Sequence, residues 1–379
     1  MNPLHQLYEF GQSVWMDNLS REMFGSGQLK QFKSDYGLTG ITCNPTTFAK
    51  ALSSGDAYDD DIRAHAEQDH SPEQAVEEML AKDVRMACDV FADIYEKTNG
   101  EDGFVSIEVA PNLARHTQET IEAARRMWRL VDRPNCMVKI PGTREGLPAI
   151  EQALVDGINV NITLLFSPER YEEVVDAHVG ALKQRSAAGL PIKHIASVAS
   201  FFLSRIDVMV DELLAHRAPP GAPKGGSMAG QLMGKTAIAC AKQTYQAFER
   251  LYGENPAWQT LAQHEPRLQR PLWASTGVKS PDLPETYYVD ALVAPQTVNT
   301  MPEKTLKAYA EEGNPSESAI KVDMGVAEQQ IEALSKLEIH YRDIAHRLED
   351  QGIQKFVDSW DQALATAKER LDEAKKQHA

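Results

Sequence analysis

The sequence has few cysteines and no long apolar run. Its four cysteines, Cys43, Cys88, Cys136 and Cys240, are far apart and none belongs to a Cys-x-x-Cys pair. We therefore expect reduced packing residues and no redox centre. No stretch reaches the roughly 18 apolar residues of a membrane span, and the N-terminal residues lack the basic start and apolar run of a secretory signal. These absences predict a cytoplasmic protein without a membrane partner.

Positive charge is scarce as well. The 379 residues include 39 Lys and Arg against 55 Asp and Glu, which gives a formal net charge of -16. Such a surface opposes attraction to phosphate backbones and anionic lipids, so we expect no nucleic acid partner. An anionic substrate would have to be held by a few local cations and backbone amides.

Motifs for metal-dependent and serine-dependent catalysis are missing. The 11 histidines are scattered, His-Glu-x-x-His is absent, and no group of cysteines and histidines has zinc-site spacing. No Gly-x-Ser-x-Gly elbow marks a nucleophilic serine. We expect no metal and no cofactor.

Short apolar runs of strand type alternate with longer segments of helical periodicity. This alternation is typical of repeated βα units and a parallel sheet. Eight runs have strand character: residues 13–19, 40–45, 104–109, 136–141, 160–166, 194–202, 271–277 and 289–295. Eight units close most economically into an α/β fold of the (β/α)8 TIM barrel type, although a doubly wound open sheet would show the same alternation. Serine–proline pairs at Ser71, Ser167 and Ser280 predict helix starts.

Two segments exceed what eight units need. Residues at about 203–270 predict a helical insertion between strands 6 and 7, with helices near 205–216 and 230–251. The glycine-rich loop at 219–227 follows a helix and lacks Walker spacing, so we interpret it as a mobile loop and not as a phosphate loop.

The second segment is a C-terminal helical extension at about 324–377. Its apolar stripe predicts docking on the barrel, and no linker separates a second domain, so residues 1–379 should form a single domain. The stripe consists of Ile353, Phe356, Trp360, Leu364, Ala367 and Leu371.

Side chains alternate between the two faces of a strand, so in a barrel one parity points to the interior. Val138 and Ile140 share the outer face of their run, which leaves Lys139 pointing inward. The same argument places these side chains inside: Trp15, Asp17, Thr42, Asn44, Ser106, Glu108, Asn161 and Thr163. Because unpaired buried polar groups cost roughly 1 to 3 kcal/mol each, this set indicates a functional site.

Each of these residues also has a purely structural explanation. Lys139 alone could be a solvated lysine at a strand edge, and Asp17 or Glu108 could be half of an ion pair. Asn44 and Asn161 alone would more often be turn or capping residues. The coincidence of all of them on the inner faces of several strands favours a site.

A lysine in a dry interior has a clear chemical use. Desolvation disfavours the charged form of an amine, which frees it to attack a carbonyl. The protonated imine then accepts electrons while an adjacent carbon–carbon bond breaks or forms. Asp17 and Glu108 are the candidates for the proton transfers that this chemistry needs.

Several segments closely resemble the transaldolase family, and specifically its longer bacterial branch. They are Trp15–Ser20, Gly40–Pro45, Val138–Thr143, Gly157–Ser167, Ser200–Asp207 and Trp273–Lys279. The resemblance implies a (β/α)8 barrel that needs no cofactor. It also implies a reaction of the pentose phosphate pathway, in which a dihydroxyacetone unit moves from sedoheptulose 7-phosphate or fructose 6-phosphate to glyceraldehyde 3-phosphate or erythrose 4-phosphate.

The resemblance implies roles for four catalytic residues. Lys139 would form the Schiff base, and Asp17 would be the acid and base of the carbon–carbon step. Glu108, with a water held by Thr163, would relay protons during formation of the imine.

The resemblance further implies a set of substrate-binding residues. Asn44, Asn161 and Ser200 would hold hydroxyls, Phe202 would line the pocket, and Arg205 with Ser275 would bind phosphate. Shorter family members have a phosphate-binding arginine where this chain has Gly277. Lys279 is the candidate for the missing charge, although a lysine cannot reproduce a bidentate arginine.

Two other functions stay open. A fructose 6-phosphate aldolase would share the lysine but release free dihydroxyacetone, and such relatives are much shorter. A non-catalytic barrel that binds sugar phosphates would have no use for a nucleophile. A monomer and a homodimer are both compatible with the sequence.

Overall fold

The computed structural model describes residues 2–219 and 225–378. Eight parallel strands close into a barrel in chain order, because β1 pairs with β2 on one side and with β8 on the other. The strands are β1 (Gln12–Met16), β2 (Gly40–Thr42), β3 (Val105–Glu108), β4 (Cys136–Pro141), β5 (Val160–Leu165), β6 (Ser197–Phe202), β7 (Gln269–Ala274) and β8 (Thr297–Met301). The predicted (β/α)8 barrel is confirmed.

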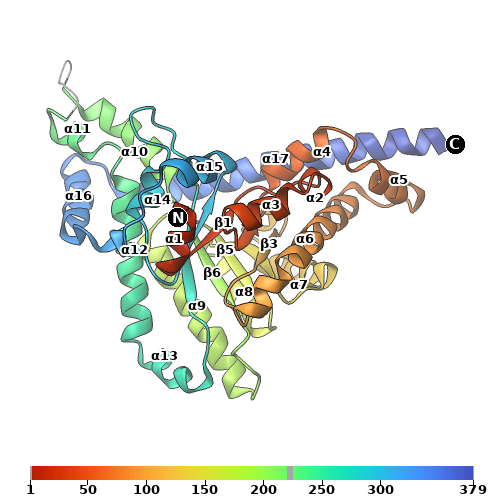
Figure 1. The fold of residues 1–379 in the computed structure, drawn as a ribbon, viewed down its shortest axis with the longest axis horizontal. Coiled ribbons are helices and arrows are strands. Elements are labelled where there is room, and N and C mark those ends of the chain that lie inside the picture. Colours follow the sequence, from red (N-terminus) through yellow and green to blue (C-terminus); the bar gives the residue numbers. More distant parts are fainter. Residues whose placement is uncertain (1, 220–224, 379) are drawn as a thin grey trace.

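Helices surround the barrel (Figure 1). Those before β6 are α1 (Pro3–Glu9), α2 (Glu22–Gly25), α3 (Gln28–Asp35), α4 (Pro45–Ser53), α5 (Asp59–Glu67), α6 (Pro72–Lys97), α7 (Thr117–Val131), α8 (Gly146–Val155) and α9 (Pro168–Ala187). Those after β7 are α14 (Tyr287–Ala291), α15 (Glu303–Glu312), α16 (Met324–Lys336) and α17 (Tyr341–His378). Ser71 and Ser167 cap α6 and α9 as predicted, since each side chain accepts a hydrogen bond from the backbone N–H three residues later at 3.2 Å.

The prediction of the eighth strand at 289–295 is wrong. That run begins inside the short helix α14, and β8 starts only at Thr297. The run is apolar because Val289, Leu292 and Val293 are fully buried, and a short buried segment gives the same signal in a helix, a loop or a strand. Ser280 likewise begins no helix, because residues 281–283 form a turn before α14.

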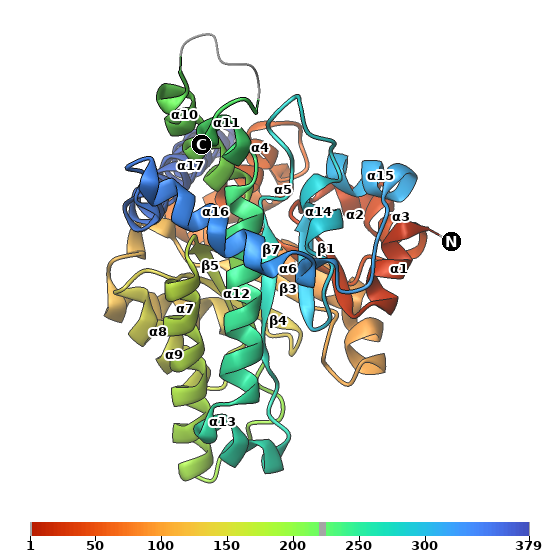
Figure 2. The same ribbon diagram turned by 90° about the vertical axis from the view of Figure 1, so that its left-hand side faces the viewer.

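Four α-helices lie in the described part of the segment between β6 and β7. They are α10 (Ser204–Arg217), α11 (Met228–Leu232), α12 (Thr236–Gly253) and α13 (Pro256–Leu261). The longest of them, α12, packs beside α9 on the outside of the barrel (Figure 2). In the predicted loop at 219–227, residues 220–224 lie outside the described residues. The division of the chain into one barrel domain with an insertion stays a prediction.

The C-terminal extension ends in the long helix α17, which passes the barrel and continues beside α4 and α5 (Figure 1). Its predicted apolar stripe is confirmed: Phe356 joins the barrel core, while Trp360 and Leu371 join a second cluster with Phe48 and Tyr58. Gly352 lets the helix approach the strand ends closely. A Cβ atom there would stand 2.9 Å from Cδ2 of Leu164 and 3.4 Å from Nη1 of Arg205.

Trp15 packs inside the barrel against β2. Its indole Nε1 donates to Oδ1 of Asp102 at 2.8 Å, and its ring lies over Gly40, the residue with which it pairs in register. A Cβ atom on Gly40 would stand 2.6 Å from the Trp15 ring and 2.8 Å from the carbonyl oxygen of Phe104. The ring and the barrel wall therefore require a glycine at this position.

Replacing Gly40 by Ala should lower the free energy of unfolding by about 1 to 3 kcal/mol, because the added methyl group overpacks the interior. Urea unfolding followed by circular dichroism measures the change. Gly325→Ala in α16 is the matched control, since no described atom beyond its chain neighbours and the adjacent backbone of its own helix lies within 4 Å of its Cβ position. The control should gain up to about 1 kcal/mol from helix propensity, and equal stability of the two variants would contradict the packing argument.

Candidate active site

A cavity of about 250 Å³ lies at the carboxyl ends of the strands, the end at which TIM-barrel enzymes place their active sites. Predicted residues that line it are Asp17, Asn44, Lys139, Ser200, Phe202, Arg205 and Ser275. A larger cavity of about 590 Å³ is lined by Gly11, Arg267 and Arg270 at the amino ends of the strands. TIM-barrel enzymes do not place their active sites at the amino ends of the strands, so the smaller cavity is the better candidate for the active site.

Lys139 and Glu108 form a buried ion pair between β4 and β3. Nζ of Lys139 lies 2.9 Å from Oε2 of Glu108 and donates to the carbonyl oxygen of Cys43 at 3.2 Å. The two residues are paired in register, so the direction of each follows from strand parity as predicted. They are only 5% and 7% exposed respectively. Burial raises the pKa of Glu108, and the charge of Lys139 opposes that shift.

Asp17 follows β1 and faces the same cavity as Lys139. Burial raises the pKa of its carboxyl group from 3.8 to about 6, against the opposing charges of Lys139 and Lys279. A carboxyl group with a pKa in this range exchanges a proton readily near neutral pH, which suits general acid–base catalysis.

Asn161 and Thr163 lie on β5 and are fully buried. The amide of Asn161 donates to Oγ of Ser106 at 2.9 Å and accepts from Oγ of Ser200 at 2.8 Å. These bonds tie three strands together and orient Ser200 toward the cavity that it lines. Oγ1 of Thr163 and Oε1 of Glu108 are buried and have no hydrogen-bond partner within the described part of the chain.

Asn44 lines the cavity and also caps α4. Its Oδ1 accepts from the backbone N–H of Thr47 at 3.0 Å, and its Nδ2 donates to the carbonyl oxygen of Asp17 at 3.3 Å. Asn44 is therefore a capping residue, which is the purely structural explanation given for it above. The cap also fixes the direction in which this side chain meets the cavity.

Cationic groups gather at the side of the cavity where α10 begins. Arg205 stands in the first turn of α10, with its guanidinium carbon 5.3 Å from the ring centre of Phe202. Ser275 has a left-handed backbone, φ 55°, and its Oγ lies 2.9 Å from Oγ of Ser204. A neighbouring cavity of about 630 Å³ shares Arg205 and Ser275 with the first and is also lined by Lys279. Arg205 and Ser275 thus lie where the two cavities meet.

Lys279 does not line the smaller cavity, unlike most of the predicted residues. Its Nζ stands 3.8 Å from the position that a Cβ atom would take on Gly277. The amine therefore lies beside the place where shorter family members carry an arginine, and its charge acts on the carboxyl group of Asp17.

Two residues of α17 that line the smaller cavity were not predicted as site residues. The ring of Phe356 lies 5.6 Å from Nζ of Lys139 and 5.6 Å from the guanidinium of Arg205, so this helix covers the site. Lys355 lines both cavities, and the charge of Arg205, followed by burial and Lys279, lowers its pKa. The apolar stripe could have identified Phe356 as buried, but an exposed lysine beside it gives no signal.

The family described as Transaldolase/Fructose-6-phosphate aldolase matches residues 14–367. The chain belongs to this family of enzymes. It is 46% identical over 370 residues to a transaldolase of Thermobifida fusca, with 98% of each chain covered. It is 45% identical over 372 residues to a transaldolase of Saccharopolyspora erythraea, again with 98% of each chain covered.

A more distant member of the transaldolase family, from Mycobacterium leprae, is 41% identical over 376 residues, which cover 99% of this chain and 98% of that protein. The predicted family is confirmed. Among the described helices, none is long and apolar enough to cross a membrane.

Replacing Asp17 by Asn should raise the free energy of unfolding near pH 8 by about 1 to 3 kcal/mol. The folded state holds the Asp17 proton more tightly than the unfolded state, since the pKa rises from 3.8 to about 6. Stability of the wild type therefore falls as the pH rises through this interval, and the variant should escape that loss. Urea unfolding at about pH 8 and about pH 4 measures the difference, which should be much smaller at the lower pH, where the folded state is protonated and the unfolded state is partly so.

Asp372→Asn, at an exposed position on α17, is the control for the change of one charge. If Asp17→Asn gained the same stability at both pH values, the pH dependence could not be assigned to Asp17. The same would follow if Asp372→Asn showed an equal pH dependence.

Proposed function

We propose that this chain is a transaldolase that moves a dihydroxyacetone unit between sugar phosphates through a Schiff base on Lys139. The donor is sedoheptulose 7-phosphate or fructose 6-phosphate, and the acceptor is glyceraldehyde 3-phosphate or erythrose 4-phosphate. One observation carries the proposal: the amine of Lys139 is buried 2.9 Å from the carboxylate of Glu108 and faces a cavity that Asp17 also lines.

Imine formation begins with transfer of a proton from the Lys139 ammonium to Glu108, which the 2.9 Å contact permits. The neutral amine adds to the ketose carbonyl, and the carbinolamine then loses its oxygen as water. Oε1 of Glu108 and Oγ1 of Thr163 are buried polar atoms without a partner in the part of the chain described. Because such atoms normally find one, we assign them the water that carries protons between Glu108 and the carbinolamine oxygen.

Asp17 acts in the carbon–carbon step. Its carboxylate removes the proton of the donor hydroxyl next to the scissile bond, the bond breaks, and the electron pair enters the protonated imine. The aldose phosphate leaves, and an acceptor aldehyde takes its place. Protonated Asp17 then returns the proton to the oxygen of the new hydroxyl. A pKa of about 6 serves both directions of this exchange.

The phosphate group binds where α10 begins. Arg205, Lys279 and Lys355 line the joined cavities, and the N-terminus of α10 adds its dipole. Three local cations overcome the overall charge of -16 at this point. Asn44, Asn161 and Ser200 bind sugar hydroxyls or hold in place the groups that bind them. Phe202 and Phe356 exclude water from the reacting carbons.

The alternatives have less support. Curated relatives named transaldolase match nearly the whole chain, which favours transfer over release of free dihydroxyacetone. A barrel that only binds sugar phosphates gains nothing from a buried amine and carboxylate. We also propose a cytoplasmic location, supported by four free, buried cysteines, and either a monomer or a homodimer.

Incubation with fructose 6-phosphate followed by borohydride should leave a three-carbon adduct on the peptide that contains Lys139, because borohydride reduces the imine to a stable amine. Mass spectrometry of the digest measures the adduct. Lys139→Met should lose both adduct and turnover while keeping its circular dichroism spectrum, and Lys183→Met, an exposed lysine on α9, should keep both. Active protein without an adduct would contradict the mechanism. Release of free dihydroxyacetone at full rate without an acceptor would identify an aldolase.

Removal of Lys279 or Lys355 should raise KM for phosphorylated donors roughly tenfold or more, since hydrogen bonds to charged groups contribute about 1.5 to 3 kcal/mol. Steady-state kinetics of Lys279→Met and Lys355→Met against fructose 6-phosphate measure the effect, and activity with unphosphorylated fructose should change little. Lys368→Met, also exposed on α17, is the control. An unchanged KM for fructose 6-phosphate in both variants would exclude these lysines from the phosphate site.

A further inference from the structure

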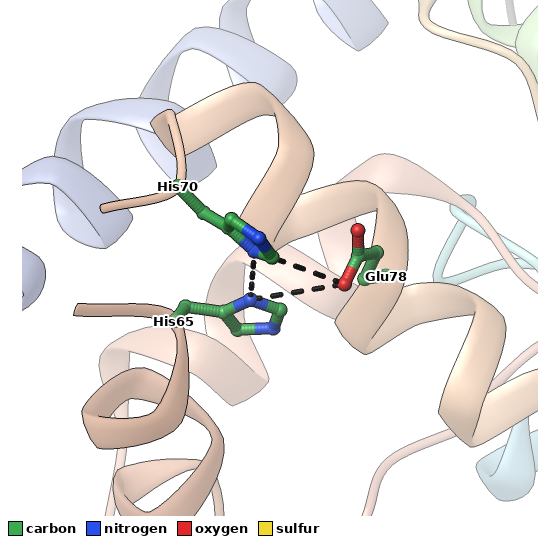
Figure 3. A group of neighbouring side chains, drawn as sticks. All are labelled: His65, His70 and Glu78. Atoms are coloured by element: carbon green, nitrogen blue, oxygen red, sulfur yellow. Dashed lines mark hydrogen bonds and ion pairs between the residues drawn. The ribbon is translucent and has the colours of Figure 1, made fainter. Parts of the chain in front are cut away.

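Three side chains far from the proposed pocket form a group with the chemistry of a metal site (Figure 3). Nδ1 of His65 lies 2.9 Å from Nδ1 of His70. Oε2 of Glu78 lies 3.8 Å from Nδ1 of His65 and 3.9 Å from Nδ1 of His70. His65 belongs to α5, His70 to the turn that follows, and Glu78 to α6.

The three ligand atoms are spaced as one small cation requires. A triangle whose sides are 2.9, 3.8 and 3.9 Å has a circumscribed radius of about 2.1 Å, and zinc binds imidazole nitrogen and carboxylate oxygen at roughly 2.0 to 2.2 Å. One ion could therefore reach all three atoms with small side-chain adjustments. A hydrogen bond between the two imidazoles explains the 2.9 Å contact alone, but not why the carboxylate faces both rings from beyond hydrogen-bonding distance.

The backbone holds the ligands in place. Asp69 has a left-handed backbone, φ 53°, which reverses the chain after α5, and the N–H of His70 donates to the carbonyl oxygen of His65 at 3.1 Å. Ser71 then caps α6. The second oxygen of Glu78 accepts from Nε2 of Gln74 at 3.1 Å. Such support of the ligands by neighbouring groups is a feature of built metal sites.

We propose that His65, His70 and Glu78 bind one divalent transition-metal ion of the zinc type, with a fourth position open to solvent. Two neutral imidazoles and one carboxylate suit zinc and similar ions better than magnesium or calcium, which prefer oxygen ligands. The side chains are 10%, 18% and 34% exposed, so an ion can enter. A water can complete a tetrahedron once the carboxylate oxygen moves toward the two nitrogens and the ion leaves the plane of the three ligand atoms.

The position of the site indicates its effect. The α5–α6 turn packs against the distal part of α17, where Lys375 pairs with Asp69. An ion bound there would link α5 to α6 and stiffen the surface on which α17 lies. Because it would bind the folded state, saturating zinc should raise the thermal midpoint by roughly 2 to 5 °C.

Calorimetric titration of the full, chelator-treated chain with zinc chloride tests the proposal. We expect one ion per chain, and cobalt(II) should give the visible absorption of a tetrahedral site. His70→Gln and Glu78→Gln each remove one ligand and should weaken zinc binding tenfold or more and abolish the thermal shift. These two positions are preferred to His65, which is the most buried of the three.

His264→Gln and Glu73→Gln, at exposed positions outside the group, are the matched controls and should bind zinc as the wild type does. Absence of zinc binding at micromolar concentrations would overturn the proposal. Zinc binding that is unchanged in both His70→Gln and Glu78→Gln would also overturn it, because the ion would then lie elsewhere.

Discussion

Lys139 and Glu108 face each other from neighbouring strands inside a closed barrel, 2.9 Å apart and almost entirely removed from water. Burying two such charges costs several kcal/mol for each ion, and their attraction offsets this cost only when geometry and further hydrogen bonds are favourable. Here one further bond goes to Cys43, while Oε1 of Glu108 has no partner among the described residues. Packed apolar residues in the same places would serve stability at least as well. The pair is therefore more easily explained by chemistry than by folding.

The dryness of this pair depends on a helix that is distant in sequence. Phe356 on α17 covers Lys139 and Arg205, and Gly352 permits the close approach. The next turns of α17 are held by a separate apolar cluster in which Trp360 packs with residues of α4 and α5. Helix docking outside the barrel thus controls solvent access to an amine inside it. The strands position the charged groups, and the extension sets the medium in which they interact.

Strand parity explains which parts could be predicted from sequence. Where branched residues alternate with polar ones, as around Lys139, a period of two assigns every side chain to a face. In β8 the residues Thr297–Met301 are too polar to stand out, so the sequence pattern favours the apolar segment before them and gives no signal for Thr300 as a cavity residue. Lys355 was missed because an amphipathic stripe predicts that a helix docks, but not over which strand ends. His65, His70 and Glu78 follow no familiar spacing, because a left-handed turn at Asp69 brings them together.

The proposed covalent step preserves the electrostatics of the site. A protonated imine carries the same positive charge as the Lys139 ammonium, at nearly the same position. The attraction that limits the rise in the pKa of Asp17 and of Glu108 therefore persists after the substrate is bound covalently. If the amine became neutral and stayed so, both carboxyl groups would hold their protons more tightly, and a smaller fraction of Asp17 would be ionised and able to accept a proton when the carbon–carbon bond has to break. A nucleophile that regains its charge on forming the imine thus keeps its neighbouring base active, which a neutral covalent intermediate such as an ester would not do.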